Sequence, residues 1–143
     1  AHVPWDDFAS AQLSFPYLMG LAARFRGIKF EHFDEKTRRD PAFAAFAKKL
    51  NITAPTEIDQ LYPRLRPARV TVTTVRGSFV RQADEALGSR LVPLDDAGLN
   101  DKFLGLVAPV LGEKCAKDLS ARLWMVDEID NVTTLVEAMA LSQ

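Results

Sequence analysis

The stretch that decides the fold is ARVTVTTVRGSFVRQAD, residues 68–84. Its first half alternates valine with threonine and arginine, which is the period of two expected for a half-buried β-strand. Arg76 and Gly77 then predict a two-residue turn with Gly77 at positive φ, followed by a second strand from Ser78 to about Ala83. The stretch therefore predicts an antiparallel β-hairpin.

The predicted turn also fixes which side chains face one another. A two-residue loop at Arg76-Gly77 places Phe79 opposite Thr74, on the face that carries Val70 and Val72. A bulge would shift the register by one residue and move Phe79 to the other face. The pairing is open between these alternatives.

Helical patterns precede the hairpin. Ser14 is expected to cap a helix through the Tyr17 N–H, with a proline in its first turn and Gly27 as its end. Asp40 followed by proline starts a second helix, whose apolar residues recur at helical spacing until Asn51. A short edge strand over about residues 52–58 is a further expectation.

Helical patterns also follow the hairpin. The first of these helices is expected to be capped by Asp95 or Asp96 and to end or kink at Pro109. A second follows Gly112, and a third is expected to be capped by Asp130 or Asn131. Helices on both sides of a small antiparallel sheet define an α+β fold.

The composition narrows the class of protein. The 143 residues suffice for one domain, and 48% apolar with 26% charged residues is typical of a soluble globular chain. A net charge of −1 predicts neither a nucleic-acid partner nor an anionic membrane surface, and no apolar run reaches the length of a membrane span. The single Cys115 excludes an intrachain disulfide and favours a reducing compartment, which predicts a cytoplasmic location.

The sequence contains no recognisable combination of catalytic residues. The sequence has no glycine-rich phosphate loop, no His/Cys metal spacing and no Gly-x-Ser-x-Gly elbow. His32 is either a general base or a surface residue in a charged connection, and Cys115 is expected in the core. Five arginines crowd the hairpin and either meet a polycarboxylate or protect the sheet edge by charge: Arg64, Arg66, Arg69, Arg76 and Arg81.

Several segments, taken in order, resemble the MmgE/PrpD family. AQLSFPYLMGLA resembles the family's Ala-x-Phe-Ser-Leu-Pro-Tyr helix, RRDPAFAAFAKKLNI its Asp-Pro helix, and RPARVTVTTVRGSFV its Pro-Ala-x-Val-x-Val hairpin. GSRLVPLDDAGLNDKFLGLV and LWMVDEIDNVTTLVEAM resemble the later segments. Arg-Gly stands twice where the family often has Asp-Gly or Asn-Gly, and the usual proline pattern after Gly88 is missing.

The resemblance implies that residues 1–143 are a single domain forming the C-terminal portion of a two-domain enzyme. The implied partner is an N-terminal helical domain or a complementary chain, with a homodimer as a further expectation. Members such as 2-methylcitrate dehydratase, cis-aconitate decarboxylase and iminodisuccinate epimerase act on small di- and tricarboxylates without metal or organic cofactor. This implies a lyase or isomerase whose main acid–base residues lie upstream, so that the isolated chain is inactive.

The resemblance also selects two candidate site residues. Tyr17 matches the aromatic residue that ends the family's Ser-x-x-Tyr motif and is predicted as catalytic, while Ser14 is predicted to bind substrate. The alternative is a packed Tyr17 with its hydroxyl satisfied. The alternative for the whole chain is a non-catalytic binding or dimerisation module.

Overall fold

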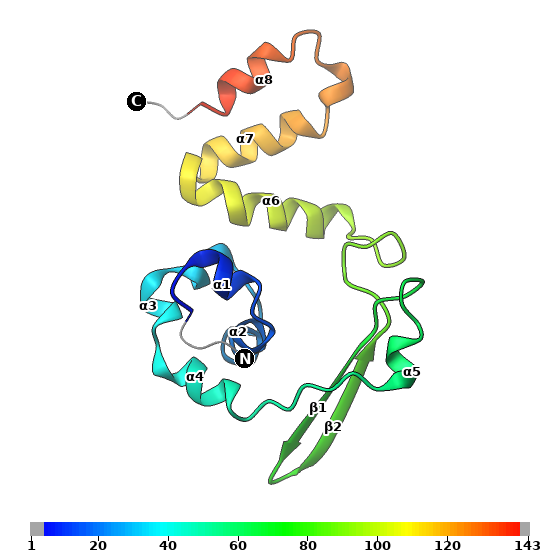
Figure 1. The fold of residues 1–143 in the computed structure, drawn as a ribbon. Helices are drawn as coiled ribbons and strands as arrows, with labels where there is room; N and C mark the ends of the chain where they lie inside the picture. The colour runs from blue at the N-terminus through cyan, green and yellow to red at the C-terminus, as the bar shows by residue number, and fades with distance from the viewer. Residues whose placement is uncertain (1–4, 141–143) are drawn as a thin grey trace. The chain divides into compact units, whose positions relative to one another are not determined.

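The computed structural model of the chain describes residues 5–140, which divide into two compact units, one up to Thr53 and one from Ala54 onward. The first unit is helical and contains α1 (Phe8–Gln12), α2 (Phe15–Phe25), the 3₁₀ turn η1 (Phe30–Phe33), α3 (Glu35–Arg38) and α4 (Pro41–Ala47) (Figure 1). The second contains α5 (Thr56–Asp59), β1 (Ala68–Thr74), β2 (Gly77–Ala83), α6 (Asp96–Leu111), α7 (Glu113–Leu123), η2 (Val126–Glu128) and α8 (Thr133–Ala138). The predicted α+β class is confirmed.

The helices of the first unit begin where polar side chains satisfy the free backbone N–H groups. Asp7 caps α1, Ser14 caps α2 by accepting from the Tyr17 N–H, and Asp34 caps α3. Asp40 caps α4 and is followed by a proline at the first helical position, as predicted. Local sequence signals therefore set these four helix starts.

The core of the first unit is a small aromatic cluster. Its buried residues are Trp5, Ala11, Tyr17, Leu21 and Phe43. A Cβ added at Gly20 would lie 2.8 Å from Cδ1 of Phe43, so only glycine lets α2 and α4 approach this closely.

Two predicted helix ends in this unit are wrong. Helix α2 ends at Phe25, and its C-cap Arg26 takes the left-handed conformation (φ 57°) at the position before Gly27. Helix α4 ends at Ala47 with Lys48 as its C-cap, and Lys49 and Leu50 continue in shorter i→i−3 bonds, so that Asn51 follows a 3₁₀-like turn.

The hairpin forms as predicted, but its turn lies one residue earlier. Thr74 pairs with Gly77, and Phe79 pairs with Val72 rather than with Thr74. The Thr74 hydroxyl accepts from the Arg76 N–H (3.1 Å) and donates to the Gly77 carbonyl (3.2 Å), and this closes the turn around Val75 and Arg76. Because the register moves by two residues, Phe79 keeps its predicted face, and Gly77 keeps its positive φ of 129°.

The expected strand over residues 52–58 is wrong. Pro55 instead acts as the N-cap of the four-residue α5, whose first turn carries Glu57. Helix α6 is capped by Asp95, one of the two predicted caps. The helix does not end at Pro109 but continues to Leu111, so the proline lies within its last turn. Helices α6 and α7 are joined at Gly112 (φ 80°).

Candidate functional site

Ser14 stands at the start of α2 and is used twice as an acceptor. Its Oγ receives the Tyr17 N–H (3.3 Å) and the indole Nε1–H of Trp5 (2.7 Å). A serine hydroxyl offers two lone pairs and one O–H. Within residues 5–140 no group accepts this O–H, so it is what Ser14 has to offer a ligand. This donor suits a carboxylate.

Tyr17 lies at the centre of the aromatic cluster with its side chain fully buried. Its ring packs 4.9 Å from Trp5 and 5.1 Å from Phe43, centroid to centroid. Its hydroxyl donates to the backbone carbonyl of His32 at 2.7 Å. Burial raises the pKa of the Tyr17 phenol to about 12, against the opposing effect of the nearby Arg38. The phenol is therefore held neutral.

The catalytic role predicted for Tyr17 stays a prediction, and it would require a change in the hydrogen bonding of the Tyr17 hydroxyl. Because the hydroxyl proton is engaged with His32, a substrate carboxylate must replace that carbonyl before Tyr17 can donate to it. The other predicted alternative, a packed ring with a satisfied hydroxyl, matches the geometry of the described residues.

The His32 side chain is packed and mostly buried, unlike a surface residue in a loop. Its ring stacks on Phe25 at 4.3 Å with an interplanar angle of 16°, and its side chain is only 11% exposed. Nδ1 accepts the Lys29 N–H at 3.1 Å, so the neutral ring carries its proton on Nε2. Nε2 lies 4.0 Å from a carboxylate oxygen of Glu31. The ring is thus oriented by contacts on two sides.

Arg38 is a residue that the sequence did not single out. Its Nε donates to the Phe33 carbonyl (2.9 Å) and its Nη1 to the Trp5 carbonyl (3.0 Å). The guanidinium therefore ties the start of the described chain to η1 and places a positive charge near Tyr17. No local motif marks such a contact, because it joins residues 33 positions apart.

The remaining candidates belong to the second unit and form no acid–base set with one another. Arg69 bonds to Gln82 across the hairpin (3.0 Å) and lies 3.7 Å from Glu57. Cys115 is only half-buried rather than in the core, and its thiol faces the Ala138 carbonyl at 3.8 Å. Among residues 5–140, no three His, Cys, Asp or Glu side chains are grouped to hold a metal ion.

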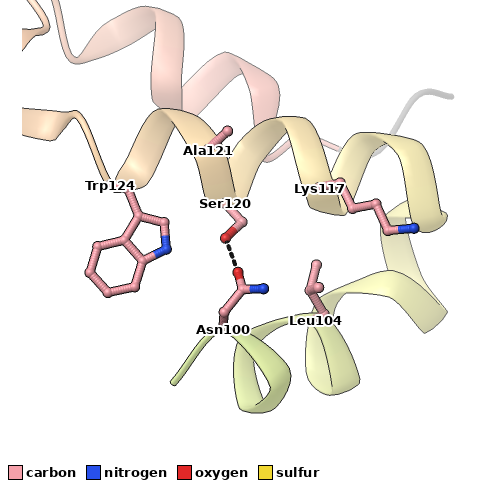
Figure 2. A pocket seen from close by; sticks show the side chains of 6 residues that line it. All are labelled: Asn100, Leu104, Lys117, Ser120, Ala121 and Trp124. Atoms are coloured by element: carbon pink, nitrogen blue, oxygen red, sulfur yellow. Dashed lines mark hydrogen bonds between the residues drawn. The ribbon is translucent and has the colours of Figure 1, made fainter. Parts of the chain in front are cut away.

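A pocket of about 360 Å³ lies between α6 and α7 (Figure 2). Its lining residues are Asn100, Leu104, Lys117, Ser120, Ala121 and Trp124. The buried Ser120 hydroxyl donates to Oδ1 of Asn100 at 2.5 Å, which fixes the orientation of that amide. Figure 2 shows the Trp124 indole on one side of this pair and Leu104 and Lys117 on the other. The pocket is therefore a groove with an aromatic end.

The described residues have an α+β fold, in which helices precede and follow a β-hairpin along the chain and a buried tyrosine lies in the core of the first unit. The family model for the MmgE/PrpD C-terminal domain matches residues 2–136, so the chain belongs to the MmgE/PrpD family and carries its C-terminal domain. A search of curated proteins finds no match to the chain. No helix in the described part of the chain is long and apolar enough to cross a membrane.

Proposed function

We propose that this chain is the C-terminal domain of a lyase or isomerase that acts on a small di- or tricarboxylate. In this proposal the enzyme removes or moves a proton next to a carboxylate, with loss of water, loss of CO₂ or inversion at carbon. The observation that carries the proposal is the family match, which extends over residues 2–136. The main acid–base groups are contributed by the N-terminal region of the protein.

Within this proposal the first unit supplies one wall of the substrate pocket. Ser14 supports this role because its O–H remains to donate, while Trp5 and the α2 backbone hold its oxygen in place. Tyr17 takes part directly only if its hydroxyl exchanges the His32 carbonyl for a substrate carboxylate. If that exchange does not occur, Tyr17 positions the η1 segment.

A non-catalytic binding or dimerisation module is the second candidate. It is supported by the large apolar side chains that remain exposed, among them Phe79, Trp124, Met125 and Val136. Monomeric proteins seldom leave extended apolar patches in water, so such side chains indicate a surface covered by a partner. This candidate needs no chemistry from the chain.

Turnover separates the two candidates. The protein containing its N-terminal region is assayed for loss of water from 2-methylcitrate and loss of CO₂ from cis-aconitate, beside residues 1–143 alone. We expect turnover only in the presence of the N-terminal region, because removing one part of a cooperative site abolishes most of the rate. Comparable turnover by residues 1–143 alone would contradict the division of the site. An inactive long protein, tested with several carboxylates, would favour the binding module.

A further inference from the structure

The groove between α6 and α7 is lined by hydrogen-bond donors and by no acidic side chain. Of its lining residues, Asn100, Lys117 and Ser120 are polar, and none carries a carboxylate. The bond from Ser120 to Asn100 uses the serine proton and one lone pair of the amide carbonyl. The amide nitrogen of Asn100 and the Lys117 ammonium can only donate. Such a lining favours a ligand that accepts hydrogen bonds and carries negative charge.

The Asn100 amide is held in one orientation. Its Oδ1 lies 2.5 Å from the hydroxyl of Ser120, a residue that is only 6% exposed. Figure 2 shows Nδ2 of Asn100 on the side of this pair where Leu104 and Lys117 lie. Among residues 5–140 no group accepts from Nδ2. The two N–H groups are therefore oriented before a ligand arrives, which reduces the cost of binding one.

Lys117 brings positive charge to the same side of the groove. Its ammonium lies 3.1 Å from a carboxylate oxygen of Glu113, one turn earlier on α7. Both side chains are largely exposed, 64% for the lysine and 81% for the glutamate, and exposed pairs of this kind contribute little. An anion in the groove can therefore compete with Glu113 for the ammonium.

Trp124 forms the opposite end of the groove. It follows Lys117 by seven residues, or about 10 Å along the axis of α7, and its side chain is half exposed. Leu104 and Ala121 add apolar surface to the lining. An indole face packs well against another aromatic ring, in an offset or tilted arrangement. The groove thus combines an aromatic end with a cationic end.

We propose that this groove binds an elongated aromatic monocarboxylate, with the carboxylate at Nδ2 of Asn100 and the Lys117 ammonium and the ring on the Trp124 indole. The volume of about 360 Å³ lies within the range of about 300–1,000 Å³ that is usual for small-ligand sites. A compact di- or tricarboxylate would leave the indole without a partner. The proposal does not rest on the proposed function, which concerns the first unit.

Isothermal titration calorimetry of the full-length protein tests the ligand class with three probes of one length. We expect 4-phenylbutanoate to bind. The neutral 4-phenylbutanamide should bind at least about fivefold more weakly, because hydrogen bonds to a charged acceptor are the stronger ones. Replacing the ring by a saturated one, in 4-cyclohexylbutanoate, should raise the Kd about two- to tenfold through loss of aromatic packing.

Substitutions in the groove test its location. Asn100→Asp keeps an acceptor for the Ser120 hydroxyl but places a negative charge where the Nδ2 donors were, so the Kd of 4-phenylbutanoate should rise at least about tenfold. Lys117→Gln should raise it about two- to fivefold. Trp124→Leu should abolish the preference for the aromatic ring over the saturated one. The matched control is Lys114→Gln, which removes an exposed lysine paired with Asp118 on the same helix but outside the groove, and should leave the Kd unchanged.

Circular dichroism establishes that each variant is folded, and Lys117→Glu, at an exposed side chain, replaces Asn100→Asp if the latter does not fold. A wild type that binds none of the probes overturns the proposal, as expected if the N-terminal region covers the groove. So does a Kd that these charge changes leave unaltered. Binding that survives Asn100→Asp but is lost in Ser14→Ala would place the probe in the first unit, which overturns this proposal and leaves the proposed function standing.

Discussion

The Tyr17 hydroxyl donates to the His32 carbonyl at 2.7 Å, and this bond joins a fully buried side chain in the first turn of α2 to the 3₁₀ turn η1. The same turn orients the His32 ring, since Nδ1 accepts from the Lys29 N–H. Tyr17, which is predicted to be catalytic, thus also holds the backbone of η1 in place at His32. Substitution at Tyr17 therefore affects stability and activity by separable amounts.

Tyr17→Phe removes one hydrogen bond and leaves the His32 carbonyl without that partner. We expect the free energy of unfolding to fall by about 1–3 kcal/mol. Urea denaturation measures this loss, and Tyr62→Phe at a largely exposed tyrosine should change stability by less than about 0.5 kcal/mol. If the hydroxyl also binds substrate, kcat/KM of the intact enzyme should fall by a further factor of roughly 10 to 150. Unchanged stability would contradict the buried bond.

Ser14→Ala removes an N-cap and the acceptor of the Trp5 indole together. Loss of the cap costs about 1 kcal/mol, and a part-buried indole N–H without a partner costs about 1–3 kcal/mol more. Ser14→Thr keeps the hydroxyl and should retain most of the stability, which thermal melts of the two variants will compare. Equal melting temperatures for Ser14→Ala and the wild type would show that water replaces both bonds.

Gly20→Ala and Gly105→Ala should move stability in opposite directions. Alanine is the better helix former by about 1 kcal/mol, and no atom lies within 4 Å of the Cβ position at Gly105. At Gly20 the new methyl group would meet the buried Phe43 ring at 2.8 Å, and overpacking costs about 1–3 kcal/mol. Chemical denaturation should therefore show Gly105→Ala stabilised and Gly20→Ala destabilised. Stabilisation at both sites would mean that α2 and α4 separate at little cost.

Acid should weaken the first unit through its helix caps. Hydrogen bonds to Ser10, Thr37 and Ala42 hold the pKa values of the Asp7, Asp34 and Asp40 carboxyls below 3.8 in the folded chain. The unfolded chain therefore binds protons first, so this contribution is present above pH 4 and is lost as the pH falls through the folded values. Asparagine at all three positions keeps the caps and should flatten the fall in stability between pH 5 and 2.5.

The sequence predicted the features that local chemistry controls. The caps at Ser14, Asp40 and Asp95 and the hairpin depend on residues a few positions apart, and all are present. The strand expected over residues 52–58 was wrong because Pro55 also suits a helix start, which the apolar pattern alone does not distinguish.

Local sequence patterns could not predict the contacts that define the candidate site. Tyr17 meets His32 across 15 residues, and Arg38 meets the Trp5 carbonyl across 33. Both are bonds from a side chain to a backbone carbonyl, and any residue type offers that acceptor. The family resemblance selected Tyr17 and Ser14, but it contained no information on which of their hydrogen-bonding groups the fold itself uses.

The two tryptophans give each unit its own optical reporter. Trp5 is 2% exposed and bonded to Ser14 in the first unit, whereas Trp124 is half exposed in the second. Unfolding the first unit should therefore shift the indole emission to longer wavelength, while Trp124 contributes emission from a water-accessible ring from the start. A Trp124→Phe protein thus isolates the melting of the aromatic cluster, and acrylamide quenching of the wild type should separate one shielded and one accessible population.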